Sequence, residues 1–315
     1  MAMSVFDLTS TIVRMTEGNY PLITEQARER FPDLQITHEP ITADCRHKVL
    51  VGYYPPEDED VSGYDWIHVP AAGVDRMLNG LKGASRMPVI TRTIGRMGEQ
   101  MGEYCVAYTL EQLQKMALRR AFEAEQNWWK KKAAPTHLFD MTIGILGTGS
   151  IGQGIARSFK ALGARVVGYS RSGRSRAPFD QVFPMADFPG DHPPHVLVSA
   201  LPWTPQTEGL INGALFSKLE GALFINVGRG ASLDEDALKG ALEAGQVSRA
   251  VLDVFPKEPL DETHWFWTHD QVTVTPHVSG LTRDVDAADR LVDLLGRAFE
   301  IGSMPESEVD LARGY

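Results

Sequence analysis

Three residues that could carry acid–base chemistry each follow a β-rich segment. Arg229 comes after GALFINVG, Glu258 lies in the loop after SRAVLDVF, and His277 comes after QVTVTP. An arginine offers a planar fork to a carboxylate and a carbonyl oxygen, while a histidine can donate or accept a proton near neutral pH. A carboxylate bonded to the imidazole orients it and favours its charged form. This set predicts hydride chemistry at a carbonyl that lies beside a carboxylate.

Each of these residues also has an ordinary explanation. Arg229 could be a surface turn residue, Glu258 a solvated loop acid and His277 a residue that ends a buried turn. Their shared position after three strands favours the catalytic interpretation, because the carboxyl ends of parallel strands meet at one edge of a sheet. His264 and His269 precede the last strand, so we expect them to be structural or exposed.

A glycine-rich turn indicates a nucleotide site upstream. Gly147, Gly149 and Gly152 form G-x-G-x-x-G directly after the strand-like run MTIGIL and at the start of a helix-like segment. These glycines allow a tight turn, close approach of a pyrophosphate and close packing of helix on strand, while the helix N-terminus supplies N–H donors. The remaining residues of this predicted cofactor turn are Thr148, Ser150 and Ile151. The alternative is a flexible turn without a ligand.

The end of the next strand favours NADP(H) over NAD(H). An acid that binds a ribose 2′-hydroxyl belongs there, but the chain reads Tyr169-Ser170-Arg171-Ser172-Gly173-Arg174. Arg171 and Arg174 can pair with a 2′-phosphate, and Ser170 and Ser172 can add hydroxyl donors. The missing acid also argues against a methyltransferase, which would need one for the ribose. The alternative is a solvated basic loop.

These residues require a parallel sheet, and the sequence predicts an α/β protein with two doubly wound domains. In the first third we expect strands over 47–54, 65–70 and 88–93 with helices over 26–31 and 73–81; we assign no strand to the first residues. Six further strands are expected over 141–147, 164–170, 195–202, 221–228, 248–255 and 271–277. A long helix over about 101–132 marks the boundary, and a helix over 282–302 is expected to pack back on the first domain. We expect residues 1–106 plus 285–315 to form a smaller flavodoxin-like substrate domain. Residues 107–284 are expected to form a dinucleotide-binding Rossmann domain, with the cleft between the two domains.

Composition limits the partners. The formal net charge of −10 disfavours nucleic acid and anionic membranes, which reward spread lysine and arginine. Cys45 and Cys105 give neither a metal-binding spacing nor a disulfide framework, so we expect no metal and a reducing compartment. No targeting segment or long apolar stretch is visible, and the expected location is the cytoplasm.

The ordered motifs GTGSIG, LPWTPQTEGLIN, INVGRGASLDEDAL, VLDVFPKEPL and TPHVSGLT resemble the D-isomer-specific 2-hydroxyacid dehydrogenases, from about Val49 to the C-terminus. The resemblance implies that Arg229 anchors the substrate, His277 is the acid/base and Glu258 is its partner. It further implies that Asp253 contacts the nicotinamide carboxamide. The other cofactor contacts that it implies are Leu201, Pro202 and Val227.

The run AAGVD follows a strand and opens a helix, so its backbone can form an anion nest. By resemblance, the N–H groups of Ala72 and Gly73 receive the substrate carboxylate; the alternative is an ordinary glycine turn. Tyr53 stands where relatives tend to carry tryptophan, which changes a wall of the predicted substrate pocket.

Residues 170–176, SRSGRSR, are called the Arg/Ser loop below. Together with the run MGEQMGEY and the ending VDLARGY, this loop most resembles the NADPH-preferring glyoxylate/hydroxypyruvate reductase branch. This implies reduction of glyoxylate or hydroxypyruvate with NADPH, by a homodimer. Two alternatives stay open: a different 2-oxoacid substrate, or a non-catalytic NAD(P)-sensing protein on the same fold.

Overall fold

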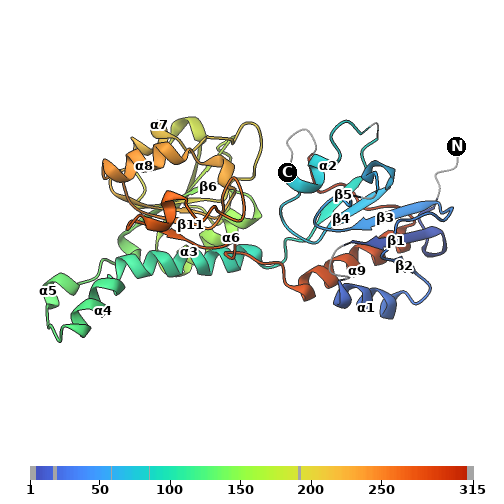
Figure 1. Cartoon of the computed structure of the whole chain (residues 1–315), viewed down its shortest axis with the longest axis horizontal. Helices are drawn as coiled ribbons and strands as arrows, with labels where there is room; N and C mark the ends of the chain where they lie inside the picture. Colours follow the sequence, from blue (N-terminus) through green and yellow to red (C-terminus); the bar gives the residue numbers. More distant parts are fainter. Residues whose placement is uncertain (1–4, 17–19, 58, 85, 191–192, 311–315) are drawn as a thin grey trace. The chain divides into compact units, whose positions relative to one another are not determined.

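The computed structural model describes residues 5–16, 20–57, 59–84, 86–190 and 193–310 of the 315-residue chain (Figure 1). The last five residues of VDLARGY therefore lie outside the described residues. The chain divides into two compact units: unit 1 comprises residues 1–96 and 282–315, and unit 2 comprises residues 97–281. The boundaries between the units lie after Arg96 and after Leu281, whereas the sequence predicts them after Val106 and after Asp284.

Unit 1 is built on five parallel strands in the flavodoxin-like order β2-β1-β3-β4-β5. The strands are β1 (Thr11–Met15), β2 (Gln35–Thr37), β3 (His47–Val51), β4 (Trp66–Val69) and β5 (Val89–Arg92), and the helices are α1 (Pro21–Arg30), α2 (Asp75–Gly80) and α9 (Asp284–Ile301). The three expected strands are confirmed. The sequence did not predict β1, although all of its residues are buried, or the short, largely solvent-facing β2.

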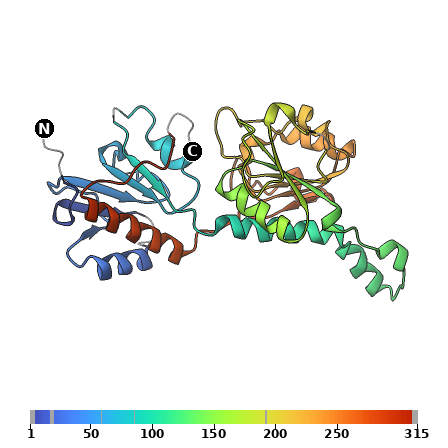
Figure 2. The same ribbon diagram turned by 180° about the vertical axis from the view of Figure 1, so that it is seen from behind.

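Helices α1 and α9 lie side by side on one face of this sheet (Figure 2). Leu291 and Leu295 of α9 pack with Val13, Val49 and Trp66 of the strands. Helix α2 covers the opposite face, where Met77 joins a second apolar cluster. Burial on both faces explains the near-continuous apolar runs of β3 and β4.

Unit 2 carries seven parallel strands in the order β12-β11-β10-β9-β6-β7-β8. The strands are β6 (Thr142–Leu146), β7 (Arg165–Ser170), β8 (Gln181–Pro184), β9 (Val196–Ser199), β10 (Ala222–Asn226), β11 (Val247–Leu252) and β12 (Val272–Val274). The helices are α3 (Met97–Leu113), α4 (Met116–Ala124), α5 (Lys130–Ala133), α6 (Ser150–Ala161), α7 (Gly213–Phe216) and α8 (Glu235–Glu243). The six expected strands are confirmed. The sequence missed β8, a partly exposed edge strand that ends in proline.

The single helix expected over residues 101–132 is wrong. The helix breaks at Lys115, which has a left-handed backbone with φ 50°, and α4 is followed by Gln126 with φ 53°. Neither residue is a glycine or a proline, so residue type gave no signal for these breaks.

Helix α3 also begins earlier than expected, at Met97, and its first turns pack on α6. A Cβ atom added to Gly154 of α6 would lie 2.5 Å from the Cα of Gly98, so these two glycines permit the close approach. This packing puts the start of α3 in unit 2. No helix among the described residues is both long and apolar enough to cross a membrane.

Candidate active site

The glycine-rich turn connects β6 to α6 as the motif predicts. Gly147 has φ 99°, and a Cβ there would lie 2.8 Å from the carbonyl oxygen of Ala200. A Cβ on Gly152 would lie 2.0 Å from the carbonyl oxygen of Gly147, so only glycine lets the helix start here. A Cβ on Gly149, which precedes α6, would meet no described atom within 4 Å. The turn therefore has open space where a pyrophosphate could approach the backbone and the N–H groups of the helix start.

The Arg/Ser loop directly follows β7, the neighbour of β6. Its turn is held locally: the hydroxyl oxygen of Ser170 accepts from the N–H of Gly173 at 3.2 Å, and Gly173 has φ 62°. Arg171 and Arg174 are exposed, and neither forms an ion pair with any residue that the structure describes. Arg176 donates to the carbonyl oxygen of Thr148 at 3.2 Å and so joins this loop to the glycine turn.

Arg229 lies in the turn after β10 and is held by its backbone. The hydroxyl of Ser232 donates to the carbonyl oxygen of Arg229 at 2.7 Å, and the buried amide of Asn226 contacts the same oxygen at 3.4 Å. The guanidinium donates to the carbonyl oxygen of Gly228 at 2.8 Å. The side chain is half-buried.

His277 and Glu258 form a pair across two loops. The Nδ1 atom of His277 lies 2.9 Å from Oε2 of Glu258. Since a carboxylate only accepts hydrogen bonds, Nδ1 is the donor and Nε2 is the other proton-transfer position. The second oxygen of Glu258 accepts from the N–H of Phe255 at 3.0 Å, which fixes the carboxylate. His277 has φ 55°, a backbone that few non-glycine residues adopt, and such strain concentrates at functional sites.

Asp253 is fully buried at the end of β11 and holds the segment that carries His277. Its carboxylate accepts from the hydroxyl of Thr275 at 2.6 Å and from the N–H groups of Val278 and Ser279 at 2.9 Å each. The hydroxyl of Tyr104 contacts Thr275 at 2.6 Å, and burial raises the pKa of Tyr104 so that it stays neutral. The loop after β12 is therefore pinned on both sides of His277.

The turns after β9 and β10 complete this edge. Leu201 and Val227 are buried, and the N–H of Val227 donates to the carbonyl oxygen of Ser199 at 3.0 Å. The carbonyl oxygen of Pro202 accepts from the hydroxyl of Thr207 at 2.7 Å. Because β12, β11, β10, β9, β6 and β7 are successive neighbours in one parallel sheet, all these turns share its carboxyl edge.

In unit 1 the predicted anion loop follows β4. Ala72 is buried and Gly73 half-buried, and their two N–H groups donate to no acceptor within the described part of the chain. Such donors cost free energy unless a ligand or water accepts their hydrogen bonds. The loop thus has the open donors that an anion nest needs.

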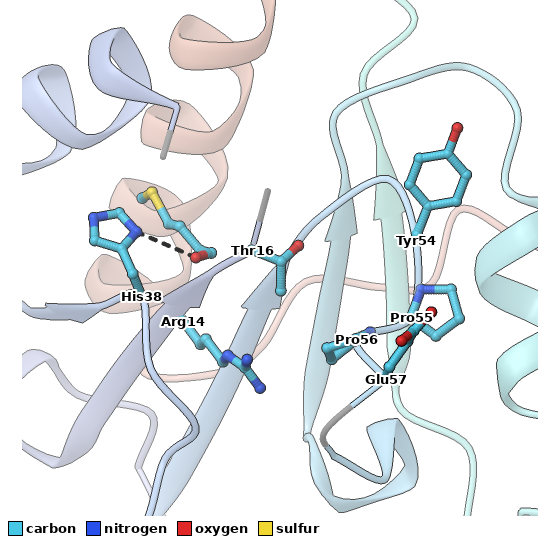
Figure 3. A pocket seen from close by; sticks show the side chains of 8 residues that line it. Arg14, Thr16, His38, Tyr54, Pro55, Pro56 and Glu57 are labelled. Carbon is cyan, nitrogen blue, oxygen red and sulfur yellow. Dashed lines mark hydrogen bonds between the residues drawn. The ribbon is translucent and has the colours of Figure 1, made fainter. Parts of the chain in front are cut away.

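A pocket of about 650 Å³ opens in unit 1 beyond the ends of β1 and β3, where the strand order reverses (Figure 3). It is lined by Arg14, Met15, Thr16, His38 and the run Tyr54–Glu57. The predicted pocket residue Tyr53 does not line it; its ring lies 5.8 Å from that of Tyr20. Its neighbour Tyr54 was not predicted, because sequence alone does not show which of two adjacent tyrosines faces a pocket.

Comparisons with known proteins agree with this geometry. Residues 106–279 match the family model described as the D-isomer specific 2-hydroxyacid dehydrogenase, NAD binding domain. A glyoxylate/hydroxypyruvate reductase A from Serratia proteamaculans is 35% identical over 257 residues, which cover 78% of this chain and 79% of the relative. The chain belongs to the D-isomer-specific 2-hydroxyacid dehydrogenase family. It is therefore an enzyme of that family, and unit 2 holds its NAD-binding domain.

Solved structures of this dehydrogenase family extend the likeness to nearly the whole chain. A D-isomer-specific 2-hydroxyacid dehydrogenase from Xanthobacter autotrophicus, in complex with NADPH and MES, has a TM-score of 0.83 and 26% identity, covering 98% of this chain and 99% of the other. An NADPH-dependent glyoxylate/hydroxypyruvate reductase from Sinorhizobium meliloti, with NADP and sulfate, has a TM-score of 0.81 and 28% identity, covering 97% and 100%.

Several supporting residues were missed at the sequence level. Arg176 is the third arginine of the run SRSGRSR, and this repetition of arginine could have indicated that it belongs to the site. Asn226 and Ser232, which fix the turn of Arg229, flank that residue in the motif INVGRGAS but carry no chemistry that marks them. His264 and His269 lie away from the pair: His264 contacts Glu235 at 3.0 Å, and His269 accepts from the N–H of Gln271.

Proposed function

We propose that this protein reduces a small 2-oxoacid to the 2-hydroxyacid with NADPH. Glyoxylate and hydroxypyruvate are the substrates we favour, because the relatives from Serratia and Sinorhizobium bear those names. The observation that carries the proposal is the 2.9 Å contact of His277 with Glu258 at the same sheet edge as Arg229. A site that only bound a nucleotide would have no use for an oriented proton donor beside an arginine.

NADPH, when bound at the glycine turn, would supply the hydride for the carbonyl carbon. Arg229 holds the substrate carboxylate and carbonyl oxygen through its planar guanidinium. As negative charge develops on that oxygen, His277 donates a proton from Nε2, since Nδ1 is engaged by Glu258. Glu258 stabilises the charged imidazole and keeps the ring in one orientation. In the oxidative direction His277 accepts the proton.

The preference for NADPH rests on the Arg/Ser loop. Both exposed arginines, Arg171 and Arg174, remain available for a 2′-phosphate, and the loop offers no carboxylate that would repel it. The relatives from Xanthobacter and Sinorhizobium were solved with NADPH and NADP, which supports this choice. The proposed cofactor contacts are Gly147, Thr148, Gly149, Ser150, Ile151, Gly152, Ser170, Arg171, Ser172, Arg174, Leu201, Pro202, Val227 and Asp253.

In unit 1 we assign the substrate carboxylate to the open N–H groups of Ala72 and Gly73. Backbone donors suit this group because they bind any 2-oxoacid alike and leave the discrimination to the rest of the molecule. We assign Tyr53 to a wall that limits the substituent on the carbonyl carbon; this residue precedes Tyr54 of the unit 1 pocket but does not line that pocket itself.

We further propose that the protein is a homodimer. Helix α4 and the segment that joins it to α5 expose large apolar side chains: Met116 and Leu118 on the helix, and Trp128 at 92% and Trp129 at 47% of their full area in the connecting segment. Sedimentation velocity tests this: we expect one species of twice the chain mass, converted to the monomer by Trp128→Glu with Leu118→Glu. A wild-type chain that sediments as a monomer at micromolar concentration would refute the dimer.

Two rivals share this fold. A reductase for another 2-oxoacid would keep Arg229 and His277 but differ at the pocket of unit 1. A nucleotide-sensing protein would bind NADPH without consuming it. The test is to mix the purified protein with NADPH or NADH, add glyoxylate or hydroxypyruvate, and follow nicotinamide absorbance. We expect rapid loss with NADPH and slow loss with NADH. Tight NADPH binding without turnover on a wider 2-oxoacid panel would favour the sensor.

A further inference from the structure

Arg92 is the last residue of β5, and its guanidinium reaches the loop after the neighbouring strand β4. Its Nη1 atom donates to the carbonyl oxygen of Ala72 at 3.0 Å. Its Nε atom is buried and has no acceptor, and the guanidinium forms no ion pair, among the residues that the structure describes. Among the described residues, the one hydrogen bond of the Arg92 side chain therefore goes to the predicted anion loop, at Ala72.

The environment of Arg92 makes this arrangement costly. Burial lowers the pKa of Arg92, because a desolvated guanidinium loses favourable interactions with water. The charge of Glu308 opposes this lowering of the pKa, but Glu308 accepts from the backbone N–H of Arg92 at 3.0 Å and forms its ion pair with Arg290. Arg14 of the same sheet differs, since Glu59 neutralises it directly. A half-buried guanidinium that no carboxylate pairs with directly costs stability, so its presence indicates a role other than stabilising the fold.

The geometry of the peptide bond supplies that reason. In a trans peptide the carbonyl oxygen and the following N–H point in opposite directions, and the Ala72–Gly73 bond is trans. Because the Ala72 carbonyl points at Arg92, the N–H of Gly73 points away from it. A cation on the carbonyl oxygen also polarises the peptide and makes its N–H a stronger donor.

We propose that Arg92 is a positioning residue, which orients and polarises the Ala72–Gly73 peptide so that the Gly73 N–H binds the substrate carboxylate. This rests on the proposed function, in which that N–H receives the carboxylate. Arg92 acts through the loop, and its substitution weakens the substrate complex more than the chemistry that His277 performs in unit 2.

Steady-state kinetics with glyoxylate test the role through the split between KM and kcat. Arg92→Met keeps the apolar stem and removes the cation, and we expect KM to rise about 10- to 100-fold with kcat reduced less and NADPH affinity unchanged. Arg92→Lys keeps a charge within reach and should recover part of the loss. Arg86→Met is the matched control, because Arg86 is exposed and forms an ion pair with Asp65. Equal KM values for the Arg92 and Arg86 variants would overturn the proposal.

A second readout does not depend on turnover. The sequence contains two Ala–Gly pairs, Ala72–Gly73 and Ala244–Gly245. Carbonyl-13C alanine with 15N glycine therefore gives two cross-peaks in a TROSY-HNCO spectrum of the full chain. Loss of the cation from the Ala72 carbonyl reduces the polarisation of the peptide. We therefore expect Arg92→Met to move the Gly73 cross-peak upfield in the carbonyl 13C and the amide 15N dimensions and to leave the Gly245 cross-peak in place. Arg92→Lys should give an intermediate position.

The two readouts separate the two proposals. If wild-type protein reduces no 2-oxoacid, the proposed function fails, and the Gly73 peak still reports whether Arg92 controls this peptide. If the wild-type protein is active and KM rises in Arg92→Met while the Gly73 peak stays fixed, Arg92 acts by direct contact and the positioning role is wrong. Thermal melts identify variants that fail to fold, and Arg92→Lys then carries the test.

Discussion

The proposed acid–base groups of unit 2 and the proposed anion-binding groups of unit 1 differ in how their hydrogen bonds are satisfied. At the edge of unit 2, the Asp253 carboxylate accepts three hydrogen bonds, Glu258 is held at both oxygens, and the carbonyl oxygen of Arg229 accepts three. At the edge of unit 1, the N–H groups of Ala72 and Gly73 and the Nε of Arg92 have no acceptor within the described ranges.

This difference matches what each edge has to do. Groups that transfer a proton must be held in one geometry before the substrate arrives, and unit 2 provides that preorganisation. Groups that bind an anion must keep donors open for it, and unit 1 leaves them open at a cost in stability. The two edges therefore predict different consequences of mutation.

The largest effect is expected from His277→Ala. Removing a general acid lowers kcat about 100- to 10,000-fold, while NADPH affinity stays within twofold because the glycine turn and the Arg/Ser loop are untouched. Stopped-flow turnover and fluorescence titration with NADPH measure the two quantities, with His137→Ala at an exposed histidine as control. Full activity in His277→Ala would contradict this account, because the proton would then not come from the preorganised pair of unit 2.

A smaller effect is expected from Arg171→Asp. The change removes a cation and adds an acid that can bond a ribose 2′-hydroxyl, so kcat/KM should fall about 10- to 100-fold with NADPH and rise with NADH. Arg165→Asp is a suitable control, since Arg165 is an exposed residue at the opposite end of the same strand β7. An unchanged cofactor ratio would remove the Arg/Ser loop from the site.

A third prediction concerns stability rather than catalysis and tests the description of unit 1. His68 of β4 is fully buried between the hydroxyls of Thr91 at 2.8 Å and Thr93 at 3.0 Å. Burial, with a contribution from the charge of Arg290, lowers the pKa of His68 to about 3. The unfolded chain therefore binds a proton between about pH 6.5 and pH 3 that the folded chain does not.

Stability that depends on neutral His68 is complete above about pH 6.5 and is lost as the pH falls toward 3. This group contributes a slope of about 1.4 kcal/mol per pH unit in that window. Urea titrations should give a shallower acid limb for His68→Gln than for wild type or for His137→Gln. Parallel acid limbs in all three would show that His68 is protonated in the folded state.

The two units also differ in how well the sequence predicts them. In unit 2 each proposed site residue sits in a motif at a strand end, so the sequence alone places GTGSIG, INVGRG and TPH on one edge of the sheet. In unit 1 the informative contacts join different strands: Arg92 reaches Ala72 across the sheet, and no local spacing encodes that reach.

The errors in the fold have similar causes. The break at Lys115 carries no glycine or proline that would mark it. Strand β8 is a short, partly exposed edge strand that ends in proline, so it lacks the apolar pattern of a buried strand. Helix α3 begins before its apolar pattern does, because glycines at Gly98 and Gly154 let it approach α6.

The most direct test of the central claim follows the hydride itself. Protein, glyoxylate and NADPH that carries deuterium at C4 of the nicotinamide are incubated, and glycolate is analysed by mass spectrometry, with each of the two C4-deuterated epimers in turn. The account predicts one deuterium on the carbon of glycolate from one epimer and none from the other, and labelled glycolate formed about 100- to 10,000-fold more slowly with His277→Ala. Bound NADPH with unlabelled or absent glycolate from both epimers in the wild type would contradict it.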